Sequence, residues 1–140
     1  MKKVFTNGCF DIIHPGHLKL LEYCKSIGKV IVGLNSDESV RRLKGDKRPI
    51  LNQDDRKYIL ESCKFVDEVI IFDGNLEEIR EKVVPNIVVK GGEWTAEEVR
   101  HRDNIPDDIE VKICPLLAKT STTNTIRKIK NLSDWTKDEF

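Results

Sequence analysis

Two histidines three residues apart, His14 and His17, stand where a helix is expected to begin and are the side chains best suited to chemistry. They close the stretch 6–17, which reads Thr-Asn-Gly-Cys-Phe-Asp-Ile-Ile-His-Pro-Gly-His. If both lie on the first helical turn, their rings share one face and can contact the same phosphate. The free N–H groups and the dipole of a helix start also favour an anion. We therefore predict a phosphate site over residues 6–17.

Glycine and proline in this stretch support that interpretation. Gly8 lets the backbone approach a ligand closely, and Pro15 suits a first helical turn because it has no N–H to leave unpaired. Two alternatives remain. A histidine pair can bind a metal, although a third protein ligand and an H-E-x-x-H pattern are missing. The histidines can also simply cap the helix, a reading that Gly8, Pro15 and Gly16 disfavour.

Cations gather in the loop 44–49, Lys-Gly-Asp-Lys-Arg-Pro. A basic turn of this kind is usually only solvated, but beside a phosphate-binding helix start its cations could neutralise a doubly charged substrate. Lys44 is the first candidate for phosphate contact. Arg56 lies near the start of the following helix, where the dipole disfavours a cation. Either a substrate phosphate, or merely Asp54 or Asp55, holds it there.

Two further segments have ligand-binding character. Lys90 runs into Gly91, Gly92 and Glu93 at the end of a strand, and paired glycines there let the backbone approach a flat or charged ligand, or form an ordinary turn. Trp94 is expected to pack this loop. The hydroxyl run 120–123, Thr-Ser-Thr-Thr, starts the last helix. Because capping needs only one of these residues, the surplus favours phosphate binding.

Alternating apolar patterns predict an α/β domain. The expected strands cover about 3–6, 29–34, 66–72, 87–90 and 110–114, and helices separate them. Continuous apolar runs indicate strands covered on both faces, as in a parallel sheet. Ligands gather at the carboxyl ends of such strands, where all the loops above lie. In the helix after Asn52, we expect Tyr58, Ile59, Leu60 and Cys63 to form the buried side.

Length and charge limit the function. The 140 residues suit one domain, and 24 Lys and Arg balance 24 Asp and Glu, which disfavours nucleic-acid or membrane-surface binding. The four cysteines form no C-x-x-C pair and fit reduced thiols. The amino terminus lacks the apolar segment of a secretory signal, and no run is long enough to span a membrane. We expect a cytoplasmic protein with a domain over residues 1–131 and a tail over 132–140.

Several motifs together resemble the cytidylyltransferase-like nucleotidyltransferases. Gly8-Cys9-Phe10-Asp11 followed by His14-Pro15-Gly16-His17 is similar to their G-T/C-F-D…H-x-G-H signature, and K-G-D-x-R-P, K-G-G-E-W and S-T-T follow in the same order. The resemblance spans about residues 3–130. It implies a Rossmann-like three-layer fold with a five-stranded parallel sheet. It also implies attack of a substrate phosphate on the α-phosphorus of a nucleoside triphosphate, with release of pyrophosphate.

The resemblance assigns roles by position. It makes His14, His17 and Lys44 catalytic, and Asp11, Lys44 and Arg56 substrate-binding, with no protein-held metal and with Mg²⁺ bound through the triphosphate. The nucleotide-binding residues would be Gly8, Cys9, Phe10, Gly16, Lys90, Gly91, Gly92, Glu93, Thr120, Ser121, Thr122 and Thr123. The backbone N–H groups of Cys9 and Phe10 would meet the phosphates.

The substrate follows from the subfamily that the motifs resemble most. They are most similar to the adenylyltransferase domain of ADP-heptose synthase, which implies ATP and heptose 1-phosphate. Glycerol-3-phosphate cytidylyltransferase, with CTP, is the alternative, and a non-catalytic nucleotide sensor is a third. Lys119 stands where the glycerol enzyme has arginine, which leaves that contact open. We expect a homodimer, with a sugar kinase on a separate chain.

Overall fold

The computed structural model describes residues 1–115 and 121–132, in which five strands alternate with six helices. In chain order these are β1 (Lys3–Gly8), α1 (Pro15–Ile27), β2 (Lys29–Asn35), α2 (Asp37–Lys44), α3 (Gln53–Glu61), β3 (Glu68–Phe72), α4 (Leu76–Val83), β4 (Ile87–Gly91), α5 (Ala96–Arg102), β5 (Glu110–Cys114) and α6 (Thr122–Lys130). Thr120 and Lys119, and the tail from residue 133, lie outside the described residues.

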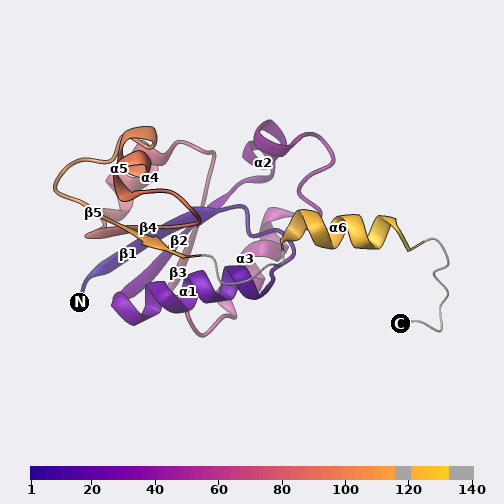
Figure 1. Ribbon diagram of the computed structural model, residues 1–140, viewed down its shortest axis with the longest axis horizontal. Helices are drawn as coiled ribbons and strands as arrows, with labels where there is room; N and C mark the ends of the chain where they lie inside the picture. Colours follow the sequence, from indigo (N-terminus) through magenta and orange to yellow (C-terminus); the bar gives the residue numbers. More distant parts are fainter. Residues whose placement is uncertain (116–120, 133–140) are drawn as a thin grey trace.

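The strands form one parallel sheet in the order β3-β2-β1-β4-β5. Helices cover both faces, with α1 and α3 on one side and α2, α4 and α5 on the other, while α6 lies beyond the end of β1 (Figure 1). The predicted five-stranded, three-layer α/β fold is therefore confirmed. Because β1 is central and the chain order reverses there, the carboxyl ends of β1 and its neighbours form the place where ligands bind in such sheets.

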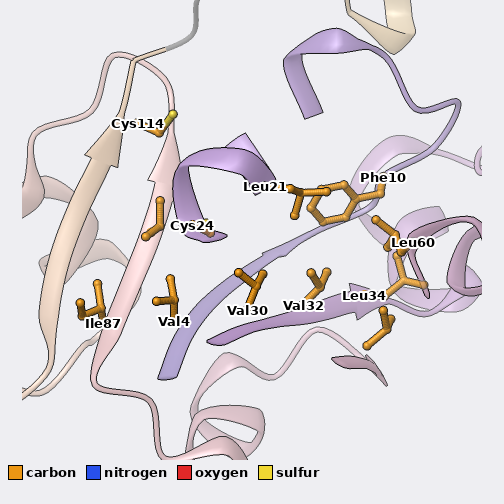
Figure 2. Packing of buried hydrophobic residues seen from close by; sticks show 12 residues of the cluster. Val4, Phe10, Leu21, Cys24, Val30, Val32, Leu34, Leu60, Ile87 and Cys114 are labelled. Atoms are coloured by element: carbon orange, nitrogen blue, oxygen red, sulfur yellow. The ribbon is translucent and has the colours of Figure 1, made fainter. Parts of the chain in front are cut away.

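Two apolar clusters hold the layers together. Between the sheet and α1, Val4, Val30 and Leu21 have no exposed surface, and Figure 2 shows their side chains packing between the strands and the helix. On the opposite face, Phe5 packs with Ile79 of α4 and with other buried residues of α5. The alternation of Val4 and Phe5 between the two faces explains why the strand reads as a continuous apolar run.

One prediction about α3 is wrong. Tyr58 is 73% exposed and Ile59 38%, whereas Leu60 is fully buried and shares its face with Arg56, one turn earlier. The polar residue occupies the core position because its guanidinium is fully hydrogen-bonded, as described below. In the part of the chain that the structure covers, no helix is both long and apolar enough to cross a membrane.

Candidate active site

The turn after β1 has an unusual backbone that Gly8 and Phe10 make possible. Phe10 and Ile12 adopt the left-handed region, with φ of 47° and 51°, which non-glycine residues rarely occupy outside tight functional turns. The Phe10 ring is 4% exposed, and a Cβ on Gly8 would come within 3.1 Å of it. Glycine is therefore needed so that the ring can fold back over the strand end and fix the turn.

His14 and His17 begin α1 as a reciprocal cap. The Nδ1 atom of His14 accepts the Gly16 N–H at 3.1 Å, and the Nδ1 atom of His17 accepts the His14 N–H at 3.3 Å. Their rings stack with centroids 3.9 Å apart. An Nδ1 that accepts a hydrogen bond carries no proton, so each neutral ring keeps its proton on Nε2. Capping and ligand binding are thus compatible, because each ring retains one donor for an anion.

The surroundings of His17 keep it neutral. Burial lowers its pKa from 6.5 to about 4, and the charges of His14 and Lys44 act in the same direction, while Asp11 opposes them. Burial also lowers the pKa of His14. At neutral pH both imidazoles therefore donate from Nε2–H as neutral groups.

This low pKa predicts a pH-dependent stability. Between about pH 4 and 6.5 the unfolded chain binds a proton at His17 that the folded chain does not, so stability rises with pH in this window. The stability that depends on a neutral His17 is fully present above the pKa of the unfolded chain and is lost as the pH falls toward 4. We expect the free energy of unfolding, measured by urea denaturation of the nucleotide-free protein from pH 4 to 7, to rise more steeply with pH in the wild type than in His17→Gln. Equal slopes would contradict this assignment.

Asp11 joins the turn to the cationic loop. Its carboxylate is 1% exposed and accepts the backbone N–H groups of Ile50 at 2.7 Å and Leu51 at 3.0 Å, together with Nε of Arg48 at 3.3 Å. The sequence places Asp11 against substrate, but here its oxygen atoms serve internal donors. The side chain therefore positions the loop of Lys44 and Arg48 beside the histidines, since a buried carboxylate is stable only when it is paired and hydrogen-bonded.

Arg56 is fully buried and joins three segments. Its Nη1 donates to the Cys9 carbonyl at 2.7 Å and to the Asn35 carbonyl at 2.9 Å, and Nε donates to the Leu51 carbonyl at 2.9 Å. Nη2 lies 2.8 Å from the carboxylate of Asp37. The anion that holds Arg56 is thus Asp37, neither Asp54 nor Asp55. Its guanidinium fixes the ends of β1 and β2, and it has no exposed surface with which to meet the predicted substrate.

The start of α6 lies against the same turn. The hydroxyl of Thr122 donates to the backbone carbonyl of Asp11, a contact between residues 111 positions apart, and Ser121 caps the helix by accepting the Asn124 N–H at 3.1 Å. Within the described residues, the N–H groups of Thr122 and Thr123 meet no acceptor. At the start of α1 the N–H groups of Gly16 and His17 are already bonded to His14, so the ring Nε2–H groups are the donors left for an anion there. The sheet edge therefore carries ring donors at the start of α1 and backbone donors at the start of α6.

Cations surround Cys9 at the centre of this arrangement. Burial raises the pKa of the Cys9 thiol, and the charges of Lys44, Arg56 and Arg48 oppose the rise. Lys44 is exposed at the end of α2 and free to reach a ligand, whereas Arg48 is held by Asp11. The role of Lys44 at the phosphates stays a prediction.

The glycine loop lies on the other side of β1. Lys90 ends β4 with its Nζ 3.5 Å from Oδ1 of Asn7, and Gly92 has a φ of 123° that only glycine adopts readily. Trp94 packs over Gly92 and is 41% exposed, which agrees with its predicted packing role. Glu93 is exposed. The loop thus flanks the end of β1 from the side opposite to α6.

A cavity of about 400 Å³ opens between α2 and the end of α5, and we call it the acceptor cavity. It is lined by Asn7, Asn35, Ser39, Arg42, Leu43, Phe72, Asp73, Gly74, Leu76, Lys90, Arg102 and Asp103. Of these, only Lys90 was assigned from sequence. Asn7, Asn35 and Asp73 could have been found, because each stands at or just after the carboxyl end of a strand.

The described residues contain no group of three or more His, Cys, Asp or Glu side chains that could hold a metal ion.

Comparisons with known proteins agree with this geometry. The model of the cytidylyltransferase-like family matches residues 5–128. The bifunctional protein HldE of Aliarcobacter butzleri is 49% identical over 131 residues, and that of Campylobacter concisus 45% over 132. These alignments cover 92% and 93% of this chain but 27% of each relative, so the chain spans about a quarter of their length.

A solved structure adds the fold. The lipopolysaccharide core biosynthesis protein of Thermoplasma volcanium superposes with a TM-score of 0.68 at 29% identity, over 86% of this chain and 99% of that one. The chain shares with that protein a parallel α/β sheet of the Rossmann-like class. The chain belongs to the cytidylyltransferase-like family and is a nucleotidyltransferase.

Proposed function

We propose that the protein transfers AMP from ATP to heptose 1-phosphate, giving ADP-heptose and pyrophosphate. An oxygen of the acceptor phosphate forms a bond to the α-phosphorus, and the bond from that phosphorus to the oxygen bridging to the β-phosphate breaks. The observation that carries the proposal is the meeting of two helix starts at one turn, where Thr122 donates to the carbonyl of Asp11 beside His14 and His17. Such a site suits a chain of phosphates.

The residues supply charge stabilisation and positioning, which is what phosphoryl transfer requires of a protein. His14 and His17 donate from Nε2–H to oxygens of the α-phosphate as charge builds there. The N–H groups of Thr122 and Thr123, which meet no acceptor within the described residues, hold the distal phosphates, and Lys44 neutralises the reacting ones. Mg²⁺ would be held by the triphosphate rather than by protein side chains and would supply further positive charge there.

The acceptor cavity supports a sugar phosphate as the second substrate. Its volume of about 400 Å³ lies in the range of small-molecule sites, and its lining mixes cations with carboxylate and amide groups that suit hydroxyls. Asn7 lines the cavity and is followed directly by Gly8, which ends β1 and begins the next turn. We call this turn, residues 8–12, the phosphate turn. The acceptor phosphate would therefore approach from one side of β1 while pyrophosphate leaves toward α6, as in-line displacement requires.

Pyrophosphate release tests this proposal. ATP, CTP and GTP are each incubated with heptose 1-phosphate, glycerol 3-phosphate and a panel of other sugar phosphates. We expect the highest kcat/KM with ATP and heptose 1-phosphate. A preference for CTP with glycerol 3-phosphate would replace the adenylyltransferase by the cytidylyltransferase alternative. Nucleotide binding without turnover for any pair would instead indicate a sensor.

Replacing Lys44 with alanine should chiefly raise the KM for the phosphate acceptor, because the exposed ammonium can neutralise an incoming dianion beside His17. The loss should be about tenfold or more in kcat/KM for the acceptor, with a smaller change in nucleotide affinity. Lys47→Ala, three residues further along the same exposed loop, is the matched control. Unchanged acceptor kinetics in Lys44→Ala would remove Lys44 from the site.

A further inference from the structure

Asp103 is a carboxylate shared between two cations in the wall of the acceptor cavity. Its side chain is 9% exposed, with Oδ1 3.0 Å from Nε of Arg102 and Oδ2 4.0 Å from Nζ of Lys90. The Arg102 guanidinium lies over the Trp94 ring, 4.4 Å from its centroid. The carboxylate of Asp103 therefore lies between Arg102 and Lys90 in the wall of the cavity.

Lys90 retains binding capacity in this arrangement. An ammonium has three donors, and within residues 1–115 and 121–132 its neighbours are Asn7 Oδ1 at 3.5 Å and Asp103 at 4.0 Å. Both distances exceed that of a normal charged hydrogen bond. Burial lowers the pKa of Lys90, and the charge of Asp103 opposes that change. An anion that enters the cavity can thus bind Lys90 more closely than the protein itself does.

Any such anion also meets the carboxylate of Asp103. A bare anion is repelled by it, because a carboxylate offers acceptors only. A phosphate ester with hydroxyl groups can instead place its phosphate on Lys90 and donate an O–H to Asp103. That hydrogen bond is charge-assisted and offsets the repulsion. Lys90 and Asp103 together therefore attract phosphate esters that carry hydroxyl groups and reject anions that have no O–H to donate.

We propose that Asp103 is a specificity-determining residue that restricts the acceptor cavity to hydroxylated phosphate esters and excludes anions that have no O–H to donate, such as sulfate. The proposal rests on the proposed function, because it treats this cavity as the acceptor site. A purely structural role is the competing explanation. The backbone of Asp103 joins the end of α5 to the fold, since its N–H donates to the Val99 carbonyl and its carbonyl accepts from Arg80. Its carboxylate contacts the two cavity cations Arg102 and Lys90, so selectivity between anions, rather than stability, separates the two explanations.

Asp103→Asn keeps those backbone contacts and the side-chain shape while removing the charge. We expect kcat/KM for the sugar phosphate to fall about tenfold or more, because a hydrogen bond to a charged group is weakened. Inhibition by sulfate, competitive with the acceptor, should become at least about tenfold tighter as the repulsion is removed. The matched control is Asp107→Asn, an exposed carboxylate on the loop after α5, which should leave both values unchanged.

Binding gives a second measurement that does not depend on turnover. In a Trp135→Phe background Trp94 is the remaining tryptophan, and its contact with Arg102 makes its fluorescence a reporter of the cavity. Titration with sulfate should show tighter binding to Asp103→Asn than to the parent. If the ratio of the affinities for sugar phosphate and sulfate does not change, the proposal is overturned. Absence of turnover in the wild type would instead refute the proposed function and leave the sulfate titration interpretable.

Discussion

Replacing His17 with alanine is expected to lower turnover by at least about a hundredfold, with a smaller loss of nucleotide affinity. The ring has one free donor, Nε2–H, because Nδ1 accepts the N–H of His14. Its low pKa keeps the ring neutral, so the donor interacts most strongly with a phosphate oxygen that gains charge in the transition state. Steady-state kinetics and equilibrium nucleotide binding, measured on the same protein, separate the two effects.

Two variants sharpen this test. His17→Gln keeps an N–H donor at a similar reach and should recover part of the lost turnover. His101→Ala removes the third histidine, which is exposed on α5, and should behave as the wild type. If His17→Ala weakens nucleotide binding and turnover by the same factor, the ring contributes only to ground-state binding, and its transition-state role is wrong.

The sheet and the phosphate turn could be predicted from sequence because both depend on local patterns. Continuous apolar runs such as Lys29–Asn35 indicate a strand covered on both faces, and the bounds of most elements agree within two residues. The H-x-x-H spacing also predicts a shared helical face, and the rings are indeed stacked. Local spacing, capping residues and glycine preferences act over a few positions, which is why a single sequence reveals them.

The contacts that assemble the site could not be predicted in this way. Asp11 binds backbone N–H groups about 40 positions away, and Arg56 binds carbonyls on two different strands. No periodicity encodes such pairs, because the partners are backbone atoms with no residue-specific signal. The same holds for Asp103. Its place in the wall of the cavity depends on the packing of the end of α5 beside Lys90, which the local sequence does not encode. Tertiary packing decides these roles.

Together these contacts join the cationic loop, the start of α6 and Arg56 to the phosphate turn. The side chain of Asp11 binds the cationic loop and its carbonyl binds α6, while the carbonyl of Cys9 binds Arg56. The start of α6, the loop that carries Arg48 and the Arg56 guanidinium are therefore fixed relative to the same few backbone atoms. Preorganisation of this kind is what electrostatic catalysis requires, because the donors then need no reorganisation as charge develops.

Replacing Arg56 with alanine is expected to lower the free energy of unfolding by about 3–5 kcal/mol, because it leaves a carboxylate and buried carbonyls without their donor. The side chain has no exposed surface and makes hydrogen bonds to Leu51, Cys9, Asn35 and Asp37. Urea denaturation at neutral pH measures the change. Arg56→Lys should recover only part of it, since one ammonium cannot reach acceptors that a planar guanidinium bridges.

Arg41→Ala is the matched control, because Arg41 is an exposed arginine of α2 and its loss should change stability by no more than about 0.5 kcal/mol. Arg56→Met, which keeps an apolar stem of similar reach, separates packing from hydrogen bonding. If Arg56→Met is as stable as the wild type, the guanidinium contributes little and the phosphate turn is held by packing. If it is as unstable as Arg56→Ala, the buried hydrogen bonds carry the stability, and nucleotide affinity should fall with them because Cys9 and the phosphate turn lose their anchor.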